Sequence, residues 1–260
     1  MTSDPASVSR SMKLRSSVSE EEWQVRVDLA ACYRLIAYYD ITDLTFTHIS
    51  ARVPGENGNF LLNPFHMMFE EITASSLVKL DAEGKILDDT PYTYNPAGYT
   101  IHSAVLAARP DVTCVLHTHS TAGMAVASME CGLLPLTQTS LRFHKALAYH
   151  DYEGAALDLD ERPRLARDLG TEYAMILRNH GLLTVGRTIA EAFVLMHRLE
   201  SACRAQVQAQ AAGTKLIELS ENVRNHAAGQ FQATMKTPFG DREWPSLRRM
   251  MDRLDPSYKM

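Results

Sequence analysis

The sequence lacks long apolar runs, paired cysteines and an excess of positive charge. No apolar run approaches the ~20 residues that a membrane helix needs, and the first residues, MTSDPASVSR, have no signal-peptide core. The 26 Lys and Arg are outnumbered by 31 Asp and Glu, so neither nucleic acid nor an anionic membrane surface is an expected partner. The four cysteines form no Cys-x-x-Cys motif, so neither a disulfide framework nor a thiolate zinc site is indicated, and we expect a cytoplasmic protein.

What remains is ordinary globular composition, with 45% hydrophobic and 22% charged residues in a chain of 260. That length suits one large core. Residues 1–18 are rich in Ser and show no helical or strand period, so we predict a flexible N-terminal arm. Residues 19–260 are predicted to form one domain with a C-terminal helical tail from about residue 214, because no linker or internal repeat divides them.

Helical and strand patterns alternate along this domain. Capping-box spacing opens one helix at Ser19, which ends near Asp40, and another at Thr188, which ends near Gly213. Helical spacing also covers residues 96–108. The runs LTFTHISARV and FLLNPF predict a hairpin, and VTCVLHTH predicts a strand covered on both faces. The pattern predicts an α/β fold with a β-rich centre and flanking helices.

Three of the ten histidines form a candidate metal site. His117 and His119 are two residues apart in VTCVLHTH, and on a strand such side chains point to the same face. A His-x-His pair alone is weak evidence. His180 in LRNHGLL supplies a third ligand from a turn that Gly181 permits. Three neutral imidazoles suit Zn, Fe, Ni or Cu and leave positions open for a substrate, as in a catalytic site.

Three runs in this order resemble the class II aldolase/adducin family: NPAGYTIHSAVLAARPDVTCVLHTHSTAG, LAYHDYEG, and LRNHGLLTVG with its following helix. The likeness extends from about residue 25 to about residue 212. It implies a single α/β/α domain with a central, mainly antiparallel sheet, a homotetramer, and a divalent metal held by His117, His119 and His180. Zinc is the first expectation for this metal, with iron, manganese or cobalt as alternatives.

The chain departs from the sugar-phosphate aldolases of this family at their catalytic and phosphate-binding positions. Alignment on His102 places Gly98 where those enzymes have a Glu that serves as metal ligand and general acid/base. A glycine cannot move a proton, so that base is missing. Thr-His-Ile-Ser at 47–50, Asn-Pro-Phe-His at 63–66 and Pro-Ala at 96–97 replace loops of small residues that suit a phosphate. These changes resemble the adducin-like branch and indicate a small, non-phosphorylated substrate.

The altered loops supply the predicted substrate contacts. His48 and His66 lie on turns that border the substrate pocket in the family, and each is either a substrate contact or part of a solvated turn. Asn63, Asn95 and Gly98 belong to the same loops and are predicted to bind substrate with them.

Tyr149 is the predicted catalytic proton donor. It aligns with a tyrosine that, in the sugar-phosphate enzymes, protonates the carbanion from a neighbouring subunit, although a tyrosine on a strand is ordinarily half-buried packing. His150, Asp151 and Glu153 could replace the lost Glu only if their loop folds inward. His102 lies among apolar helix positions and is expected to be a hydrogen-bonded packing residue.

Three functions follow from these residues. The first is a metal-dependent carbon–carbon lyase, and decarboxylation fits Gly98 better than retro-aldol cleavage because a departing carboxylate needs no base. The second is an iron oxygenase that holds Fe(II) with three histidines and acts on an aromatic substrate. The third is a non-catalytic scaffold of the adducin type, which would have no need of three placed imidazoles.

Overall fold

The computed structural model describes residues 5–235 and 237–260. No helix within these residues is long and apolar enough to cross a lipid bilayer. The strands are β1 His48–Arg52, β2 Phe60–Leu62, β3 Val78–Leu80, β4 Cys114–Thr118, β5 Ala148–His150, β6 Ala174–Leu177 and β7 Gly181–Gly186. The helices are α1 Pro5–Ser17, α2 Glu20–Tyr38, α3 Pro96–Ala108, α4 Thr121–Ala127, α5 Gln138–Leu141, α6 Arg162–Leu169, α7 Ile189–Ala211, α8 Glu221–Thr234 and α9 Trp244–Leu254.

The seven strands form one sheet in the order β3-β2-β1-β4-β7-β6-β5. Each neighbouring pair is antiparallel except β5 and β6, which are parallel. Every residue of the central strands β4, β6 and β7 is buried, because helices cover both faces of the sheet. The predicted mainly antiparallel sheet is confirmed.

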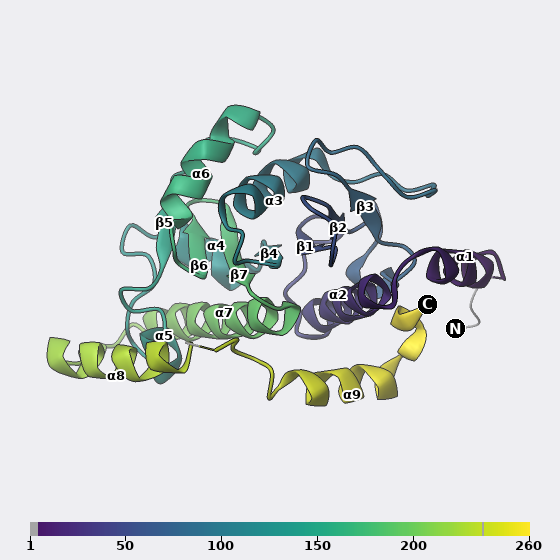
Figure 1. Ribbon diagram of the computed structural model, residues 1–260. Helices are drawn as coiled ribbons and strands as arrows, with labels where there is room; N and C mark the ends of the chain where they lie inside the picture. Colours follow the sequence, from purple (N-terminus) through teal and green to yellow (C-terminus); the bar gives the residue numbers. More distant parts are fainter. Residues whose placement is uncertain (1–4, 236) are drawn as a thin grey trace.

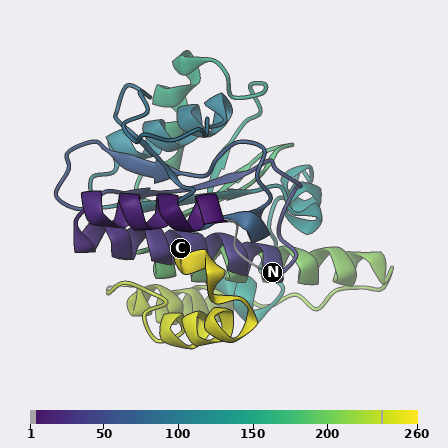
Figure 2. The ribbon, with the colours of Figure 1, turned by 90° about the vertical axis from the view of Figure 1, so that its right-hand side faces the viewer.

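Two layers of helices enclose the sheet (Figure 1), and the view from the side shows the same arrangement (Figure 2). On one face α2 and α7 bury apolar side chains such as Leu35 and Phe193 in one core cluster. On the other face α3 and α6 bury Ile101, Val105 and Leu165 in a second cluster. The single α/β/α domain predicted from the sequence is therefore confirmed.

The start of the chain differs from its prediction. Pro5–Ser17 forms helix α1, so the expectation of a segment without regular structure is wrong there. Tertiary contacts stabilise this helix: Leu14 packs against the core, and the Arg10 guanidinium lies 5.1 Å from the centre of the Tyr92 ring. These contacts are long-range, so the local sequence pattern did not indicate them. Residues 1–4 of the predicted arm lie outside the described residues.

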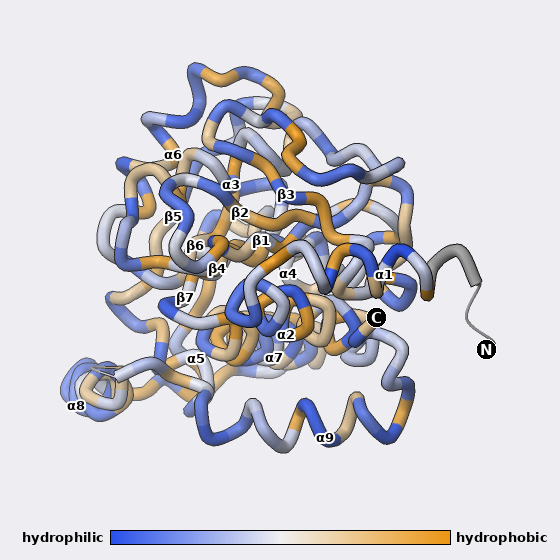
Figure 3. The backbone as a smooth tube through the Cα atoms, turned by 45° about the vertical axis from the view of Figure 1, so that its right-hand side comes forward, coloured by the Kyte–Doolittle hydropathy of each residue, from blue (hydrophilic) through white to orange (hydrophobic). Residues whose placement is uncertain are grey.

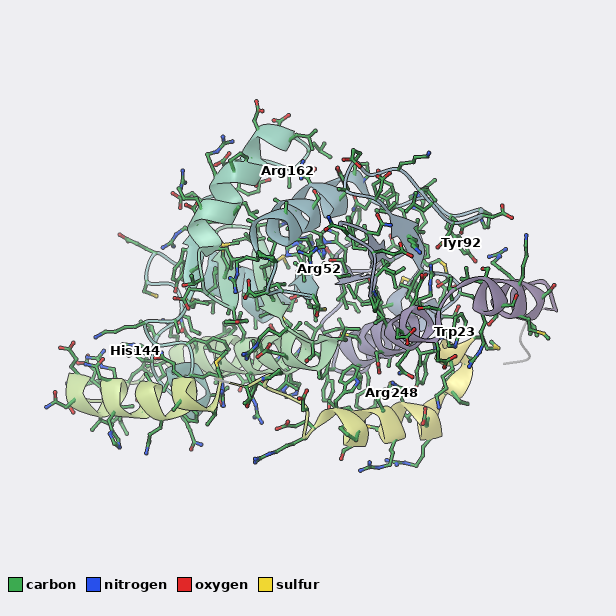
Figure 4. All side chains as sticks on the ribbon, in the orientation of Figure 1. Trp23, Arg52, Tyr92, His144, Arg162 and Arg248 are labelled. Atoms are coloured by element: carbon green, nitrogen blue, oxygen red, sulfur yellow. The ribbon has the colours of Figure 1, made fainter. Side chains whose placement is uncertain are left out.

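The segment predicted as a helical tail from about residue 214 contains two unlike helices. α8 extends away from the body (Figures 1 and 3), and Ala228 is its buried residue. α9 instead lies against α2, where Trp244 Nε1 donates a 3.0 Å hydrogen bond to Asp28 and Arg248 contacts the same carboxylate (Figure 4). α9 is thus a part of the packed domain.

A buried ion network joins α2 to the segment around β3. Arg26 is fully buried, and its guanidinium contacts Glu22 at 2.9 Å, Asp88 at 2.7 Å and the carbonyl oxygen of Leu77 at 3.0 Å. Lys79 contacts the second oxygen of Glu22 at 2.8 Å. Charges buried in this way need partners on every side. The network therefore fixes the edge of the sheet relative to α2.

Candidate metal centre

Three imidazoles, one on a strand and two just beyond strand ends, meet at one end of the sheet. His117 is on β4. His180 lies in the turn between β6 and β7, and β7 is the neighbour of β4 in the sheet. β4 ends at Thr118, so His119 lies one residue beyond the strand and not on it as predicted. The three side chains still converge, with one ring nitrogen of each within 4.8 Å of the others. The structure thus brings the predicted ligand set together.

The hydrogen bonds of the first two histidines leave a lone pair on each ring. His117 Nδ1 donates to the carbonyl oxygen of Leu182 at 2.9 Å, and His119 Nδ1 donates to the carboxylate of Asp43 at 2.9 Å. In a neutral imidazole the other nitrogen, Nε2, is then an acceptor. The two Nε2 atoms face each other at 2.9 Å, and burial lowers the pKa of His117 well below its usual value. Facing lone pairs beside a third ring suit a divalent metal.

In the turn that carries His180, the role of Gly181 differs from the one predicted. Asn179, not Gly181, has the left-handed backbone, with φ of 56°. Gly181 is needed because a Cβ at this position would collide with the carbonyl oxygen of Thr118 on the neighbouring strand. Burial, with the neighbouring His119, lowers the pKa of His180 to about 4, so its ring is neutral and able to bind a metal at pH 7.

The sequence reasoning missed two residues near the triad. Asp43 accepts the hydrogen bond from His119 and so fixes which ring nitrogen faces the metal position. The ring of Tyr152, an exposed side chain, lies 6.2 Å from the ring of His180. A ligating histidine needs an acceptor for its second nitrogen, but no spacing rule in the sequence indicates which carboxylate supplies it.

His48 lies beside the triad on the adjacent strand β1. It is the cross-strand partner of His117, with ring centres 5.0 Å apart. Its Nδ1 is 2.8 Å from Nε2 of His102, and Nδ1 of His102 is 2.5 Å from the Ser50 hydroxyl. His102 is fully buried and bonded at both nitrogens, as predicted, and burial lowers its pKa to about 3. Burial also lowers the pKa of His48 well below its usual value.

Gly98, in the first turn of α3, lies directly against the His48 ring. A Cβ at position 98 would stand 2.7 Å from Cδ2 of His48, closer than real Cβ atoms come to a neighbour. The ring is buried and held by His102, so it has little room to move aside. His48 therefore occupies space that a side chain at position 98 would need.

The other predicted substrate contacts each have a structural partner. Asn63 is buried and accepts a 2.9 Å hydrogen bond from the Tyr33 hydroxyl. Asn95 is the N-cap of α3, and its side-chain oxygen accepts the amide N–H two residues on. His66 is exposed, has a φ of 70°, and stacks on Phe65 with ring centres 3.9 Å apart. Substrate contact by these three residues stays a prediction.

Tyr149 lies on β5, the strand at the edge of the sheet. Its hydroxyl accepts a 3.1 Å hydrogen bond from the Leu133 amide, and the Arg178 guanidinium lies 4.7 Å from the ring centre. The resemblance assigns the proton-donor role to a tyrosine from a neighbouring subunit. This role therefore stays a prediction.

Three residues that follow Tyr149 in the sequence, His150, Asp151 and Glu153, have partners other than the triad. His150 is buried, with Nδ1 2.7 Å from Asp168 on α6, and Glu153 contacts Arg164 on the same helix. The side chain of Asp151 is exposed. In the described residues no hydrogen bond or ion pair joins these three side chains to the triad, so in this structure they do not take the place of the missing Glu.

Because His48 and His102 are buried, the free energy of unfolding should depend on pH. His102 has a pKa of about 3 in the fold and an unfolded value near 6.5, so below pH 6.5 the unfolded chain binds a proton that the folded chain does not. The free energy of unfolding should therefore fall as pH drops from 6.5 toward 3, by at most about 1.4 kcal/mol per pH unit for this residue.

Urea unfolding of metal-free protein at pH 7, 6 and 5 measures this dependence. His102→Gln should show a shallower loss than the wild type, whatever its stability at pH 7. His226→Gln, at an exposed site on α8, is the matched control and should keep the wild-type slope. Equal slopes in all three proteins would contradict the assignment.

Comparison with known proteins places this geometry in a family. The family model described as class II aldolase and adducin N-terminal domain matches residues 27–207. The chain belongs to this family. The matched residues include the whole triad and also His48, Gly98 and Tyr149.

Relatives at two distances share the domain. A Pseudomonas aeruginosa protein assigned to aldolase class 2 is 52% identical over 95% of this chain and 96% of its own length. Rat alpha-adducin is 40% identical over 88% of this chain, which corresponds to only 33% of the adducin. The chain is thus an adducin-like member of the family.

Two solved structures support the fold. The crystal structure of an aldolase II superfamily protein from Pseudomonas syringae has a TM-score of 0.92 and 48% identity, covering 95% of this chain and 100% of that one. L-fuculose 1-phosphate aldolase from Glaciozyma antarctica has a TM-score of 0.76 and 29% identity, covering 93% of each chain. The family thus includes an aldolase with a named substrate.

Proposed function

We propose that this protein is a metal-dependent carbon–carbon lyase that acts on a small, non-phosphorylated hydroxy-carbonyl or carboxylate substrate. The observation that carries the proposal is the pair of facing Nε2 lone pairs on His117 and His119, with His180 as the third ligand. Zinc is the first candidate for the metal, and iron, manganese or cobalt are alternatives. When bound, such a metal acts as a Lewis acid that stabilises negative charge on the substrate after a carbon–carbon bond breaks.

Decarboxylation is the reaction that the residues favour over retro-aldol cleavage. Retro-aldol cleavage must remove a proton from a hydroxyl group, and Gly98 cannot accept one. Loss of CO2 needs no such base. The substrate-binding residues that we propose around this centre are His48, Asn63, His66, Asn95 and Gly98.

The proposed assembly is a homotetramer in the cytoplasm. A proton donor from a neighbouring subunit, as the family resemblance implies for Tyr149, requires that subunits meet at the active site. Three of the four free cysteines are buried, and none forms a disulfide, in keeping with a reducing compartment.

Metal content and turnover together test the proposed function. The purified protein is analysed for metals and then incubated with non-phosphorylated hydroxy acids and aromatic acids, while release of CO2 and of carbonyl products is measured. Turnover that a chelator abolishes and added zinc restores supports the proposal, and sugar phosphates serve as the control substrates. Absence of stoichiometric metal would contradict it.

For Tyr149→Phe we expect kcat to fall by about 10²-fold or more, because loss of a positioned proton donor typically costs that much. KM and metal content should change little, since the hydroxyl is not a ligand. Tyr173→Phe is the control, because the Tyr173 hydroxyl contacts Asp111 on the surface. Wild-type turnover by Tyr149→Phe would remove this residue from the mechanism.

An iron oxygenase is the second candidate, because three histidines without a carboxylate among the ligands can hold Fe(II). Oxygen uptake by iron-loaded protein in the presence of an aromatic substrate, without uptake by zinc-loaded protein, would favour it. The 40% identity to alpha-adducin supports a third, a non-catalytic scaffold. A protein that binds no metal and turns over none of these substrates would favour the scaffold.

A further inference from the structure

A chain of three buried polar side chains ends beside the histidine triad. Ser50 and His102 are fully buried, and His48 is 3% exposed. The Ser50 hydroxyl meets Nδ1 of His102, and Nε2 of His102 meets Nδ1 of His48. The remaining nitrogen, His48 Nε2, has no hydrogen-bond partner in the described chain. Whether this nitrogen carries a hydrogen depends on the direction of the two hydrogen bonds in the chain.

The Ser50 hydroxyl decides the direction of the chain. In the described residues the only side-chain hydrogen bond of Ser50 is the one to His102. If His102 donated to Ser50, the buried O–H would have no acceptor, which is costly. If Ser50 donates instead, Nδ1 of His102 is the acceptor and its Nε2–H donates to His48. His48 Nδ1 is then an acceptor, and the hydrogen of a neutral ring is on Nε2.

The same nitrogen lies beside the point from which a side chain at position 98 would extend. His48 Nε2 is 3.3 Å from the place of a Cβ on residue 98, and Cδ2 is 2.7 Å from it. The His48 ring also lies 5.0 Å from the ring of His117. The ring thus lies close to both the first turn of α3 and the triad.

We propose that His48 Nε2–H is a fixed hydrogen-bond donor to an anionic oxygen of a small carboxylate ligand bound beside the triad. This inference rests on the proposed function. It places a hydrogen-bond donor beside position 98, where the sugar-phosphate aldolases have a Glu that accepts a proton. A donor stabilises the negative oxygen that develops when CO2 leaves, whereas it does not deprotonate a hydroxyl. Gly98 is the residue that leaves room for it.

Oxalate, a small planar dicarboxylate, is the probe. Its affinity for zinc-loaded protein is measured by calorimetry for the wild type, His48→Ala and the control His226→Ala. His48→Ala should bind oxalate about 10- to 100-fold more weakly, as expected for a lost hydrogen bond to a charged group, with zinc stoichiometry unchanged. Unchanged oxalate affinity in a zinc-loaded variant would overturn the inference and leave the proposed function standing. A wild type that binds neither zinc nor iron, manganese or cobalt would instead overturn the proposed function.

Two further measurements test the inference even if His48→Ala fails to fold. Nitrogen NMR of histidine-labelled wild type reports which ring nitrogen carries the hydrogen, and we expect the Nε2–H form for His48. A hydrogen on Nδ1 would overturn the inference. Gly98→Ala should also weaken oxalate binding, because its Cβ displaces the His48 ring, and wild-type affinity in Gly98→Ala would contradict the geometry.

Discussion

Replacing both His117 and His119 by alanine is expected to reduce bound metal from about one ion per chain to a level that elemental analysis does not detect. A single imidazole, His180, remains, and one ligand does not hold a divalent metal against water and chelators. Lyase turnover should be lost together with the metal. Thermal unfolding of the variant, followed in parallel, checks that the protein is folded when its metal is measured.

Two single variants, with a partial loss and no loss of metal affinity, serve as controls for this double variant. Asp43→Ala leaves all three ligands in place but removes the acceptor for His119, so zinc affinity should fall by about 10- to 100-fold without being lost. His226→Ala, on the exposed side of α8, should keep full metal content. Full metal content in the double variant His117→Ala with His119→Ala would place the metal elsewhere and contradict both the site and the proposed function.

The sequence indicated the elements that local chemistry determines. α3 covers Pro96–Ala108 as predicted, because its regular apolar spacing is visible in the chain. The same holds for α7, which begins after the capping Thr188. Helix α1 was not predicted because its stability comes from tertiary contacts such as that of Arg10 with Tyr92.

The candidate site likewise has one part that the sequence predicted and one part that it did not. The triad was accessible from the sequence, because the order and spacing of His117, His119 and His180 match a family. The relation between His48 and Gly98 was not, since it depends on the distance between a strand and a helix that are far apart in the chain. The sequence predicted the absence of the Glu, whereas only the structure shows that the His48 ring lies against position 98.

For stability, the largest expected effect is at Arg26. Arg26→Met should lower the free energy of unfolding by about 3–5 kcal/mol, the usual cost of removing one partner of a buried ion pair. The loss leaves Glu22 buried with Lys79 alone and removes a hydrogen bond to the Leu77 carbonyl. Urea unfolding at pH 7 measures the change. Lys13→Ala, which breaks the exposed pair with Asp89, is the control and should leave stability unchanged.

A second variant separates the cost of a broken pair from the worth of the pair. In Arg26→Met with Glu22→Met both buried charges are gone and apolar volume replaces them, so the double variant should be less destabilised than the sum of the two single variants. That result would mean that the network specifies how α2 meets the sheet edge more than it adds stability. Additive losses would show instead that each charge is stabilised by its other partners, Asp88 for Arg26 and Lys79 for Glu22.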